Sequence, residues 1–454
     1  MSEVAVSLLS RLGDFVAAGR VLTDPPSLAP YEVDGRRPSA ALLPASVTEL
    51  AEILRFASAE RLASIPVGGK THLHIGMPPH PYDLALDLSG MNRLLDYEPH
   101  DLTLGAEPGV TYADLDRRLR ENGQFLPLAP PLPERATLGG IVAVNADTPF
   151  RYAHGTAKDL LLGAEFITGE GVVSKSGGRV VKNVTGYDLH KLLIGSLGTL
   201  AVITRLNFRT FPLPPGQKMF LAAFAESAGA FAFCRALAKS PLQPRIVDVL
   251  DPGATRLFAA PTAGSLPENS WLVVIEAAGH DSVLERHARD LTAMARQAGV
   301  AEFLALDQAQ RDRLFHLLSD FSPMALSATS TAMVFRIATL PTAVPALVEE
   351  ARRVANTHAL HCAILIRALG VIYFALLPPD NATAFPELLS CSRELMDLCL
   401  TSGASPLVER CPQEIKNTLG VWPPAGSEGQ LALRLKHVFD PQGILSPGRF
   451  RGGI

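Results

Sequence analysis

The chain of 454 residues has few cysteines, and no two of them stand at metal-binding or redox spacing. The five present are widely spread, at Cys234, Cys362, Cys391, Cys399 and Cys411. An odd number without any C-x-x-C pair argues against a disulfide scaffold, a zinc ribbon and a cysteine-ligated iron–sulfur cluster. The cysteines are therefore expected to be small buried residues in a reducing compartment, which favours a cytoplasmic protein.

Long apolar runs and an excess of charge of one sign are also absent. The nearest approach to a membrane span, residues 192–203, is broken by glycine and carries Ser196 and Thr199. The N-terminus has an acidic residue at position 3 and no basic stretch ahead of an apolar core, unlike a secretory signal. The formal net charge of −4 gives no electrostatic reason to expect nucleic acid or an anionic membrane as a partner.

Two further kinds of motif are missing. No G-x-G-x-x-G opens a strand–helix unit, so a nicotinamide-type Rossmann site is not supported. The 12 histidines are scattered without ligand spacing, so no metal site is expected. The remaining candidates for a functional site are a set of glycine pairs and a few charged residues in apolar surroundings.

The most informative of these features is a glycine pair, Gly68 and Gly69, directly after a predicted strand at residues 63–67. Glycine adopts positive φ at low cost and lets main-chain N–H groups approach a ligand closely, so that successive N–H groups can hold a phosphate. The same pattern is typical of a plain turn. The choice between the two depends on whether the chain supplies the other parts of a nucleotide site.

The length and the pattern of the chain indicate two α+β domains. A capping box, Ser46 with Glu49, predicts a helix, and a second helix is expected from Thr111. A proline-rich stretch at residues 212–216 predicts a linker, after which alanine- and leucine-rich helices alternate with strands. Strands are expected at residues 63–67, 82–88, 101–106, 271–277, 333–339 and 362–376, and a hairpin over 161–175.

Further landmarks follow the glycine pair in order. They are ATLGG at 136–140, YAHGTAKD at 152–159, KNVTGYDLHKL at 182–192, GSLGTL at 195–200 and a turn-rich tail from Phe439 to Phe450. Together they resemble the FAD-binding domain of the PCMH-type flavoproteins, the vanillyl-alcohol oxidase superfamily. Within that family the chain is most similar to the FAD-binding E subunits of bacterial glycolate oxidases. The likeness is dense over residues 40–215 and in the tail, and thinner over 217–435.

The resemblance implies a two-part, PCMH-type FAD-binding domain over residues 40–215, preceded by an N-terminal segment, 1–39. A second α+β domain, the cap or substrate domain, would span 216–435. The C-terminal segment, 436–454, would return to the FAD domain.

The resemblance also implies which residues hold the cofactor, FAD. The loop at the first glycine pair would bind the pyrophosphate through N–H groups, and the segment at 137–140 would pack against the pyrophosphate and ribityl chain. The segment at 152–159 would line the flavin or its phosphates, and residues 202–203 would present backbone groups to the adenine end. The implied residues are Pro66, Val67, Gly68, Gly69, Lys70, Thr71, Thr137, Leu138, Gly139, Gly140, Tyr152, Gly155, Thr156, Asp159, Val202 and Ile203.

The chain departs from its relatives at several positions. Covalent relatives carry a histidine directly after the glycine pair, where this chain has Lys70, so FAD is expected to be non-covalent. Lys70 either pairs with a phosphate or is a solvated turn residue. The H-G-D-G-N-x-H-type motif of related D-lactate and glycolate dehydrogenase subunits, whose histidines help bind a metal, is absent. Residues 145–149 lack the usual glycine, and Ser446 replaces a common asparagine.

A flavin that oxidises a 2-hydroxy acid needs a cation for the carboxylate and a group that takes the hydroxyl proton. Arg336 and Arg367 lie in otherwise apolar predicted strands, where a charge is costly unless paired. Each is either a catalytic carboxylate clamp or half of an ion pair. Tyr187 is a third catalytic candidate, with domain packing as its alternative. His154 is either a base or a loop histidine, and Asp159 either caps a turn or bonds a cofactor hydroxyl.

Two functions follow. The first is an FAD-dependent oxidoreductase subunit of a glycolate oxidase-like complex that acts on a small 2-hydroxy acid, of the glycolate or D-lactate class. It would pass electrons to a partner, and the resemblance implies a second flavoprotein subunit and an iron–sulfur subunit, through which it could lie at the inner membrane face. The second is a non-catalytic FAD-holding subunit whose partner carries the chemistry. A sugar-alcohol or lactone oxidase usually has covalent flavin, so Lys70 argues against it.

Overall fold

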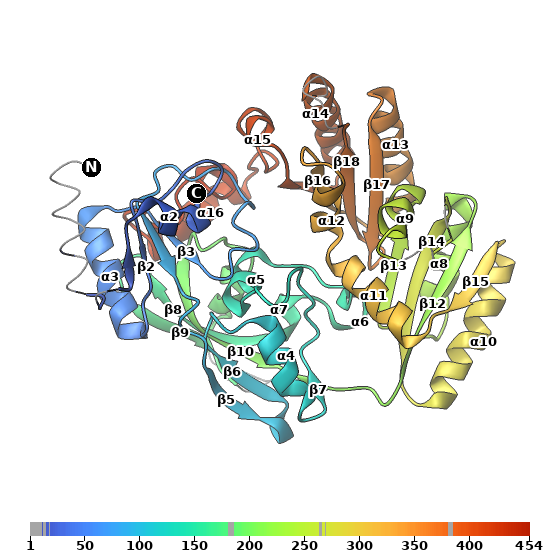
Figure 1. Cartoon of the computed structure of the whole chain (residues 1–454), viewed down its shortest axis with the longest axis horizontal. Helices are drawn as coiled ribbons and strands as arrows, with labels where there is room; N and C mark the ends of the chain where they lie inside the picture. Colours follow the sequence, from blue (N-terminus) through green and yellow to red (C-terminus); the bar gives the residue numbers. More distant parts are fainter. Residues whose placement is uncertain are drawn as a thin grey trace. The chain divides into compact units, whose positions relative to one another are not determined.

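The computed structural model describes residues 11, 15–17, 19–179, 186–262, 266–267, 269–379 and 385–454. The chain forms two compact units, each assembled from separate segments. Unit 1 comprises Met1–Ala146, Thr156–Leu213 and Pro424–Ile454, and unit 2 comprises Asp147–Gly155 and Pro214–Pro423. Both units combine helices with mostly antiparallel sheets (Figure 1), so the expected α+β fold class is confirmed.

The units differ from the expected domains in two places. The segment Asp147–Gly155 lies inside the expected FAD domain in sequence, but it belongs to unit 2. Its side chains explain why, because the Phe150 ring lies 5.1 Å from that of Phe315 and Asp147 forms ion pairs within unit 2. The C-terminal return to unit 1 begins at Pro424 rather than at residue 436.

Unit 1 contains a four-stranded sheet in the order β1-β2-β4-β3. Its strands are β1 (Val21–Leu22), β2 (Ala40–Leu42), β4 (Leu84–Asp87) and β3 (Ser64–Val67). Helix α3 (Val47–Glu60) connects β2 to β3, and its N-cap, Ser46, accepts a hydrogen bond from the Glu49 N–H, as the capping box predicts. Strand β3 runs directly into the glycine pair.

The second sheet of unit 1 is antiparallel, in the order β5-β6-β10-β8-β9. Its strands are β5 (Leu94–Glu98), β6 (Thr103–Ala106), β10 (Ala201–Arg209), β8 (Leu161–Thr168) and β9 (Val173–Gly177). Helices α4 (Tyr112–Arg120) and α5 (Leu138–Val144) share an apolar core with β6, β8 and β10. Helix α5 contains the second glycine pair, Gly139 and Gly140, of the ATLGG landmark.

The other elements of unit 1 are short, apart from the C-terminal helix α16 (Glu428–Phe439). They are α2 (Pro25–Leu28), η1 (Ala29–Tyr31), η2 (Pro99–Asp101), β7 (Gln124–Phe125), which pairs with β11 (Phe211–Pro212), α7 (Ala157–Leu160), η3 (Leu189–Leu193) and η5 (Arg451–Gly453). Residues 182–185, the start of the most specific sequence motif, lie outside the described residues.

Unit 2 is built on an eight-stranded antiparallel sheet in the order β15-β12-β14-β13-β17-β18-β16-β19. Its strands are β12 (Gln217–Phe224), β13 (Ile246–Leu250), β14 (Trp271–Ala278), β15 (Glu302–Ala305), β16 (Met333–Ala338), β17 (His361–Arg367), β18 (Val371–Leu377) and β19 (Ser405–Arg410). The sequence predicts one strand over 362–376, but the chain turns at Ala368 and Leu369, which both have positive φ, and forms the hairpin β17–β18.

Helices cover this sheet, as Figure 1 shows. They are α6 (Arg151–His154), α8 (Ser227–Lys239), α9 (Pro252–Ala259), α10 (Asp281–Gln297), α11 (Gln308–Ser319), α12 (Phe321–Ala328), α13 (Val344–Thr357) and α14 (Phe385–Thr401). Helix α15 (Gln413–Leu419) packs on α14. Helix α12 packs on β16 and β18, whereas α8 and α10 pack on β12 and β14.

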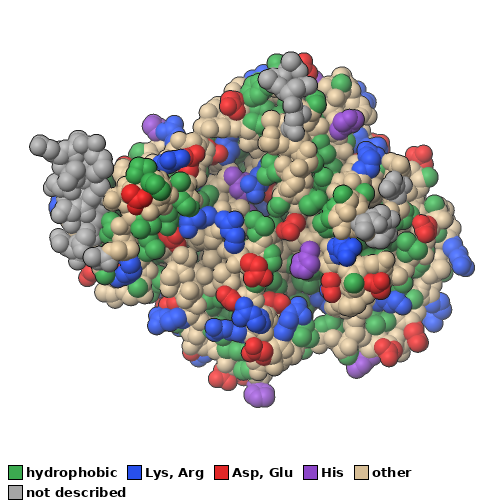
Figure 2. Space-filling view, in the orientation of Figure 1, with side chains coloured by type: hydrophobic (Ala, Val, Ile, Leu, Met, Phe, Trp, Pro, Cys, Tyr) green, Lys and Arg blue, Asp and Glu red, His purple; other side chains and the backbone are tan. Residues whose placement is uncertain are grey.

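Two searches of the described residues bear on function. None of their helices has both the length and the apolar composition of a membrane span. Among the same residues, no three His, Cys, Asp or Glu side chains are grouped so that they could hold a metal ion. On the face drawn in Figure 2, acidic and basic side chains are mixed rather than gathered by sign.

The buried carboxylate of Asp251 generates a stability prediction. It caps helix α9 and accepts hydrogen bonds from the N–H groups of Ala254 and Ile364, each at 2.8 Å. Burial, only partly opposed by these bonds, raises the pKa of Asp251 from 3.8 to about 6. Between those values the unfolded chain releases a proton that the folded chain keeps, so the fold loses up to roughly 3 kcal/mol as pH rises from 4 to above 6.

Asp251→Asn keeps a hydrogen-bond-accepting oxygen but cannot ionise. We therefore expect the melting temperature of the variant, relative to the unaltered protein, to increase between pH 4.5 and pH 7, as measured by calorimetry. The matched control is Asp307→Asn, because Asp307 caps α11 in the same way but is exposed. Equal pH dependence in the Asp251 variant and the unaltered protein would refute the prediction.

Candidate cofactor site

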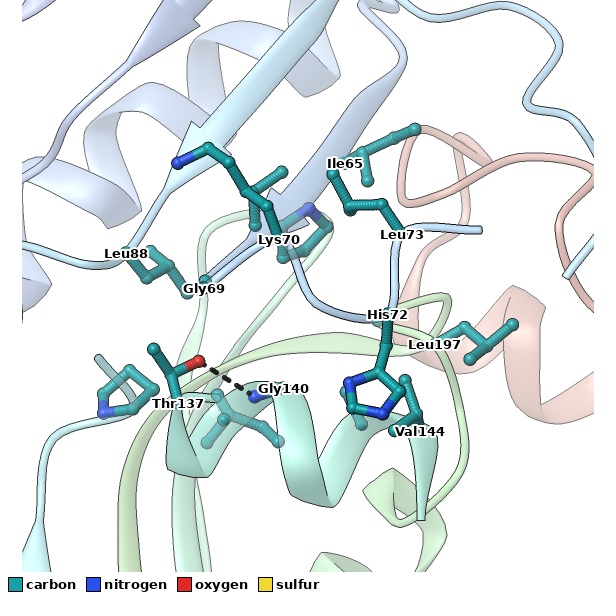
Figure 3. Close-up of a pocket in the computed structure, with 18 of the residues that line it drawn as sticks. Ile65, Gly69, Lys70, His72, Leu73, Leu88, Thr137, Gly140, Val144 and Leu197 are labelled. Atoms are coloured by element: carbon teal, nitrogen blue, oxygen red, sulfur yellow. Dashed lines mark hydrogen bonds between the residues drawn. The ribbon is translucent and has the colours of Figure 1, made fainter. Parts of the chain in front are cut away.

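Unit 1 contains a solvent-open cavity with about 810 Å³ of empty space, which includes the solvent at its mouth. Three segments wall it: the loop after β3, the first turns of α5 and the loop that precedes β10, with Arg449 from the C-terminal tail (Figure 3). Many of the expected cofactor residues line it together. They are Pro66, Val67, Gly68, Gly69, Lys70, Thr71, Thr137, Gly139, Gly140 and Ile203.

The glycine pair is required by a close approach of two chain segments. A Cβ on Gly69 would lie 1.6 Å from the carbonyl oxygen of Arg135, and one on Gly68 would lie 2.1 Å from Oγ1 of Thr137. A side chain at Gly69 would displace the Arg135 backbone, and one at Gly68 would displace the Thr137 side chain. The loop therefore lies directly on residues 135–137, which turns its main chain toward the cavity.

The N–H groups of this loop are available to a ligand. Among the hydrogen bonds of the described residues, none is donated by the main-chain N–H of Gly68, Gly69, Lys70 or Thr71. Successive N–H groups without a protein acceptor form the kind of concavity that binds a phosphate. The loop thus fits the diphosphate of a dinucleotide, and this is the strongest structural match to the expected cofactor.

The first turn of α5 has a different role. The N–H of Leu138 donates to Val110, that of Gly139 to Pro108 and that of Gly140 to Oγ1 of Thr137, so these groups are already satisfied. A Cβ on Gly139 would lie 2.7 Å from Cβ of Pro108, whereas one on Gly140 would meet only the Thr137 hydroxyl, at 3.3 Å. Gly139 is therefore needed for packing within the protein, and Gly140 leaves room in the cavity.

Lys70 is engaged by the protein rather than held out for a phosphate. Its Nζ lies 2.7 Å from Oδ2 of the buried Asp87 and 4.5 Å from the centre of the Tyr31 ring. Burial opposes ionisation of Asp87, but hydrogen bonds from Lys70, Ser89 and Tyr31 hold its pKa below the usual value. In Figure 3 the Lys70 side chain points away from Thr137 and Gly140. Neither of the two interpretations of Lys70 from the sequence included this buried ion pair.

Six expected cofactor residues do not line the cavity. Leu138 and Val202 are fully buried in the apolar cores of unit 1. Thr156 and Asp159 form the capping box of α7, in which the Asp159 carboxylate accepts from the Thr156 N–H at 2.8 Å. The capping interpretation of Asp159 is therefore observed. The last two, Tyr152 and Gly155, belong to unit 2.

The sequence analysis missed several residues of the cavity wall. Ser196, Leu197 and Gly198 belong to the GSLGTL landmark, for which the resemblance implies no cofactor contact. His72, two residues after Lys70, also lines the cavity, and its ring lies beside Val144 in Figure 3. Arg449 lies in the tail landmark, but nothing in the sequence shows that this tail reaches the glycine loop.

A second, polar hollow of about 890 Å³ adjoins the same loop. It shares Gly68, Gly69, Lys70 and Thr137 with the first cavity. The other polar residues that line it are Ser89, Asn92, Thr111, Asp114, Arg118 and Arg135. Its lining therefore combines the cations Arg118 and Arg135 with the carboxylate of Asp114.

Arg367, one of the two arginine candidates, forms a buried ion pair in unit 2. Its side chain is 3% exposed, and its guanidinium lies 3.3 Å from Asp248 and 3.9 Å from Asp147 and donates to the carbonyl of Leu318. Asp147 also pairs with Arg151 at 3.1 Å. The ion-pair alternative therefore describes Arg367, and a clamp that binds a substrate carboxylate does not.

Arg336, the other candidate, is placed differently. It lies on β16 directly opposite Tyr373 of β18, hydrogen bonds with that tyrosine and is near Asp147 and Glu409. Unlike Arg367, it is partly exposed. The Tyr373 hydroxyl lies 3.4 Å from Asp147, and Glu409 accepts a hydrogen bond from Ser322. Arg336 therefore lies at the exposed edge of a polar cluster whose interior consists of Asp147, Asp248, Arg367, Tyr373 and Glu409.

The remaining candidates are Tyr187 and His154. Tyr187 belongs to unit 1, and its side chain is 89% exposed. Its carbonyl accepts hydrogen bonds from the Ser176 hydroxyl and from the N–H of Leu189. His154 belongs to unit 2, where burial and the nearby Arg245 lower its pKa to about 4, so its ring is neutral at neutral pH.

Comparison with protein families gives two matches, one in each half of the chain. An FAD binding domain model matches residues 38–177, and a model of the C-terminal domain of FAD linked oxidases matches residues 213–374. Among solved structures, p-cresol methylhydroxylase superposes with a TM-score of 0.80 over 99% of this chain and 97% of that chain, at 17% identity. This likeness shows the fold.

Two relatives span most of the chain, and a third matches part of it. Glycolate oxidase subunit GlcD of Bacillus subtilis is 26% identical over 91% of this chain and 88% of that protein. D-2-hydroxyglutarate dehydrogenase of Xanthomonas citri is 27% identical over 96% of this chain and 94% of that protein. Glycolate oxidase subunit GlcE of Escherichia coli is 38% identical, but over only 29% of this chain and 37% of that protein.

The contrast between the cavity glycines generates a prediction about FAD. Gly140→Ala adds a methyl group that only the Thr137 hydroxyl restricts within the protein, and alanine favours helix by about 1 kcal/mol over glycine. The variant is therefore expected to melt at or above the temperature of the unaltered apoprotein, yet to bind FAD at least about tenfold more weakly because the methyl group occupies cofactor space. Fluorescence titration of apoprotein with FAD measures the affinity.

Gly178→Ala is the matched control, since a Cβ at that glycine meets nothing within 4 Å and Gly178 does not line the cavity. It should leave FAD affinity unchanged. A Gly140 variant that binds FAD as tightly as the control would show that the cofactor does not lie against the first turn of α5.

Proposed function

The chain belongs to the PCMH-type family of FAD-linked oxidases and is an FAD-dependent oxidoreductase, and we propose that its substrate is a small 2-hydroxy acid. The observation that carries the proposal is that two relatives match this chain over at least 88% of their own length. One is named for glycolate and the other for D-2-hydroxyglutarate, and both compounds are 2-hydroxy acids.

Arg336 is the residue that we propose holds the substrate carboxylate. A carboxylate is bound best by a guanidinium that presents a planar pair of donors, and Arg336 is the partly exposed arginine of the polar cluster. Asp147, Tyr373 and Glu409 fix its surroundings, whereas Arg367 neutralises the buried Asp248. The bound FAD supplies the acceptor for the hydride of the alcohol carbon.

We further propose that FAD is held without a covalent bond. The residue after the glycine pair is Lys70, and its amino group is bonded to Asp87. Acid precipitation of the purified protein should release all of its flavin into the supernatant.

The electrons are proposed to leave through partner subunits, including a second flavoprotein and an iron–sulfur subunit. Support comes from the relatives named as glycolate oxidase subunits and from the absence of any C-x-x-C pair in this sequence. The alternative function, an FAD-holding subunit whose partner carries the catalysis, is favoured by the absence of the histidine motif of related dehydrogenases.

Anaerobic reduction of the bound flavin separates the two functions. The purified FAD-loaded protein is mixed without oxygen with glycolate, D-lactate or D-2-hydroxyglutarate, and its absorbance near 450 nm is followed. Loss of the band with at least one acid is expected. A yellow protein that stays oxidised with all three acids, yet is bleached by dithionite, would support the alternative function instead.

Arg336→Met tests the carboxylate site. The substitution removes two charge-assisted hydrogen bonds, so the concentration of acid needed for half-maximal reduction should rise roughly 100-fold, with the flavin spectrum unchanged. Arg336→Lys should recover part of the loss. The control is Arg313→Met, because Arg313 is an exposed arginine of α11 in the same unit. If the Arg336→Met protein is half-maximally reduced at the same acid concentration as the unaltered protein, Arg336 does not hold the substrate carboxylate.

A further inference from the structure

The C-terminal tail after α16 supports the cofactor cavity from outside. Ser64 of β3 donates its N–H to Ile444 and accepts from the N–H of Ser446, so the tail continues the sheet beside the strand that enters the glycine loop. The buried Lys436 donates to the carbonyls of Thr199 and Leu445 and pairs with Asp440 at 2.6 Å. The tail thereby joins two of the three cavity walls.

Arg449 makes the most direct of these contacts. It is 3% exposed, and its guanidinium donates to the carbonyls of Leu73 and Ile75, which follow the glycine pair. Its own carbonyl accepts from the N–H of Met77 at 2.9 Å. Gly76 permits this approach, since it has a φ of +95° and a Cβ there would lie 2.7 Å from the Arg449 carbonyl.

Arg449 also contributes a positive charge to the cavity wall. Arg449 and Lys70 are the lysine or arginine residues of the cavity wall, and Lys70 is paired with Asp87. Burial lowers the pKa of Arg449 to about 10, so its guanidinium is charged at neutral pH. A diphosphate in the cavity would therefore be near a positive charge that also holds the loop.

We propose that Arg449 is a positioning residue for FAD: by holding the carbonyls of Leu73 and Ile75, it fixes the glycine loop before the cofactor binds, so that the loop N–H groups already face the diphosphate. Pre-organisation of this kind increases affinity because the loop does not have to be ordered on binding. The proposal concerns cofactor binding and does not depend on which acid is oxidised.

The test is the affinity of the apoprotein for FAD. Arg449→Met should bind FAD roughly 10- to 100-fold more weakly, because two charge-assisted hydrogen bonds to the loop are lost. Arg449→Lys, which keeps the charge and one donor group, should recover part of the affinity. The matched control is Arg451→Met: Arg451 lies in the same tail but contacts Glu428 and Pro424. Its FAD affinity should equal that of the unaltered protein.

Unaltered FAD affinity in folded Arg449→Met would overturn the proposal. So would an equal loss in Arg449→Met and Arg451→Met, because general weakening of the tail would then explain both results. Hydrogen exchange on the unaltered apoprotein gives a second test that needs no folded variant. The N–H groups of Ile75 and Met77, which donate to the carbonyls of His72 and Arg449, should be protected before FAD is added, and those of residues 68–71 only afterwards. Rapid exchange at Ile75 and Met77 in the apoprotein would contradict a preformed loop.

Discussion

The cofactor cavity depends on one steric constraint, the contact of the glycine loop with residues 135–137. Gly69 lies so close to the Arg135 carbonyl that a single added carbon would overlap it. Two segments distant in sequence are thereby locked together, and the N–H groups of residues 68–71 are left facing away from any protein acceptor. Glycine at this position is thus required for packing and, through packing, for exposure of the main chain. Arg449 secures the same loop where it leaves the contact, through the carbonyls of Leu73 and Ile75.

In unit 2 the corresponding constraint is electrostatic. Buried charges are tolerated when they are paired. Removal of the carboxylate that pairs with a buried arginine would strongly destabilise the fold. Arg367 forms ion pairs with Asp248 and Asp147, and Asp147 is distant in sequence from the strands of the sheet. This pairing separates two arginines that look alike in sequence. Arg367 is part of the internal structure, whereas Arg336 is only partly buried.

Patterns local in sequence predicted much of this protein. The capping box at Ser46, the strand into Gly68 and the strands near 271–277 and 333–339 were predicted from residue patterns, and the family resemblance carried by the ordered landmarks implied FAD. Contacts between distant segments could not be read from the sequence. The ion pair of Lys70 with Asp87, the hydrogen bonds of Arg449 and the transfer of 147–155 to unit 2 all depend on tertiary packing. Likewise, Val202 matches the family motif, but strand alternation directs it into the core while Ile203 reaches the cavity.

The most direct test of this account is a crystal structure of the protein with FAD bound. We expect the diphosphate oxygens to lie within hydrogen-bonding distance of the N–H groups of Gly68, Gly69, Lys70 and Thr71, in the cavity that Arg449 borders, with Lys70 still paired to Asp87. A diphosphate in the adjoining hollow, held by Arg118 and Arg135 while those N–H groups remain unused, would contradict it.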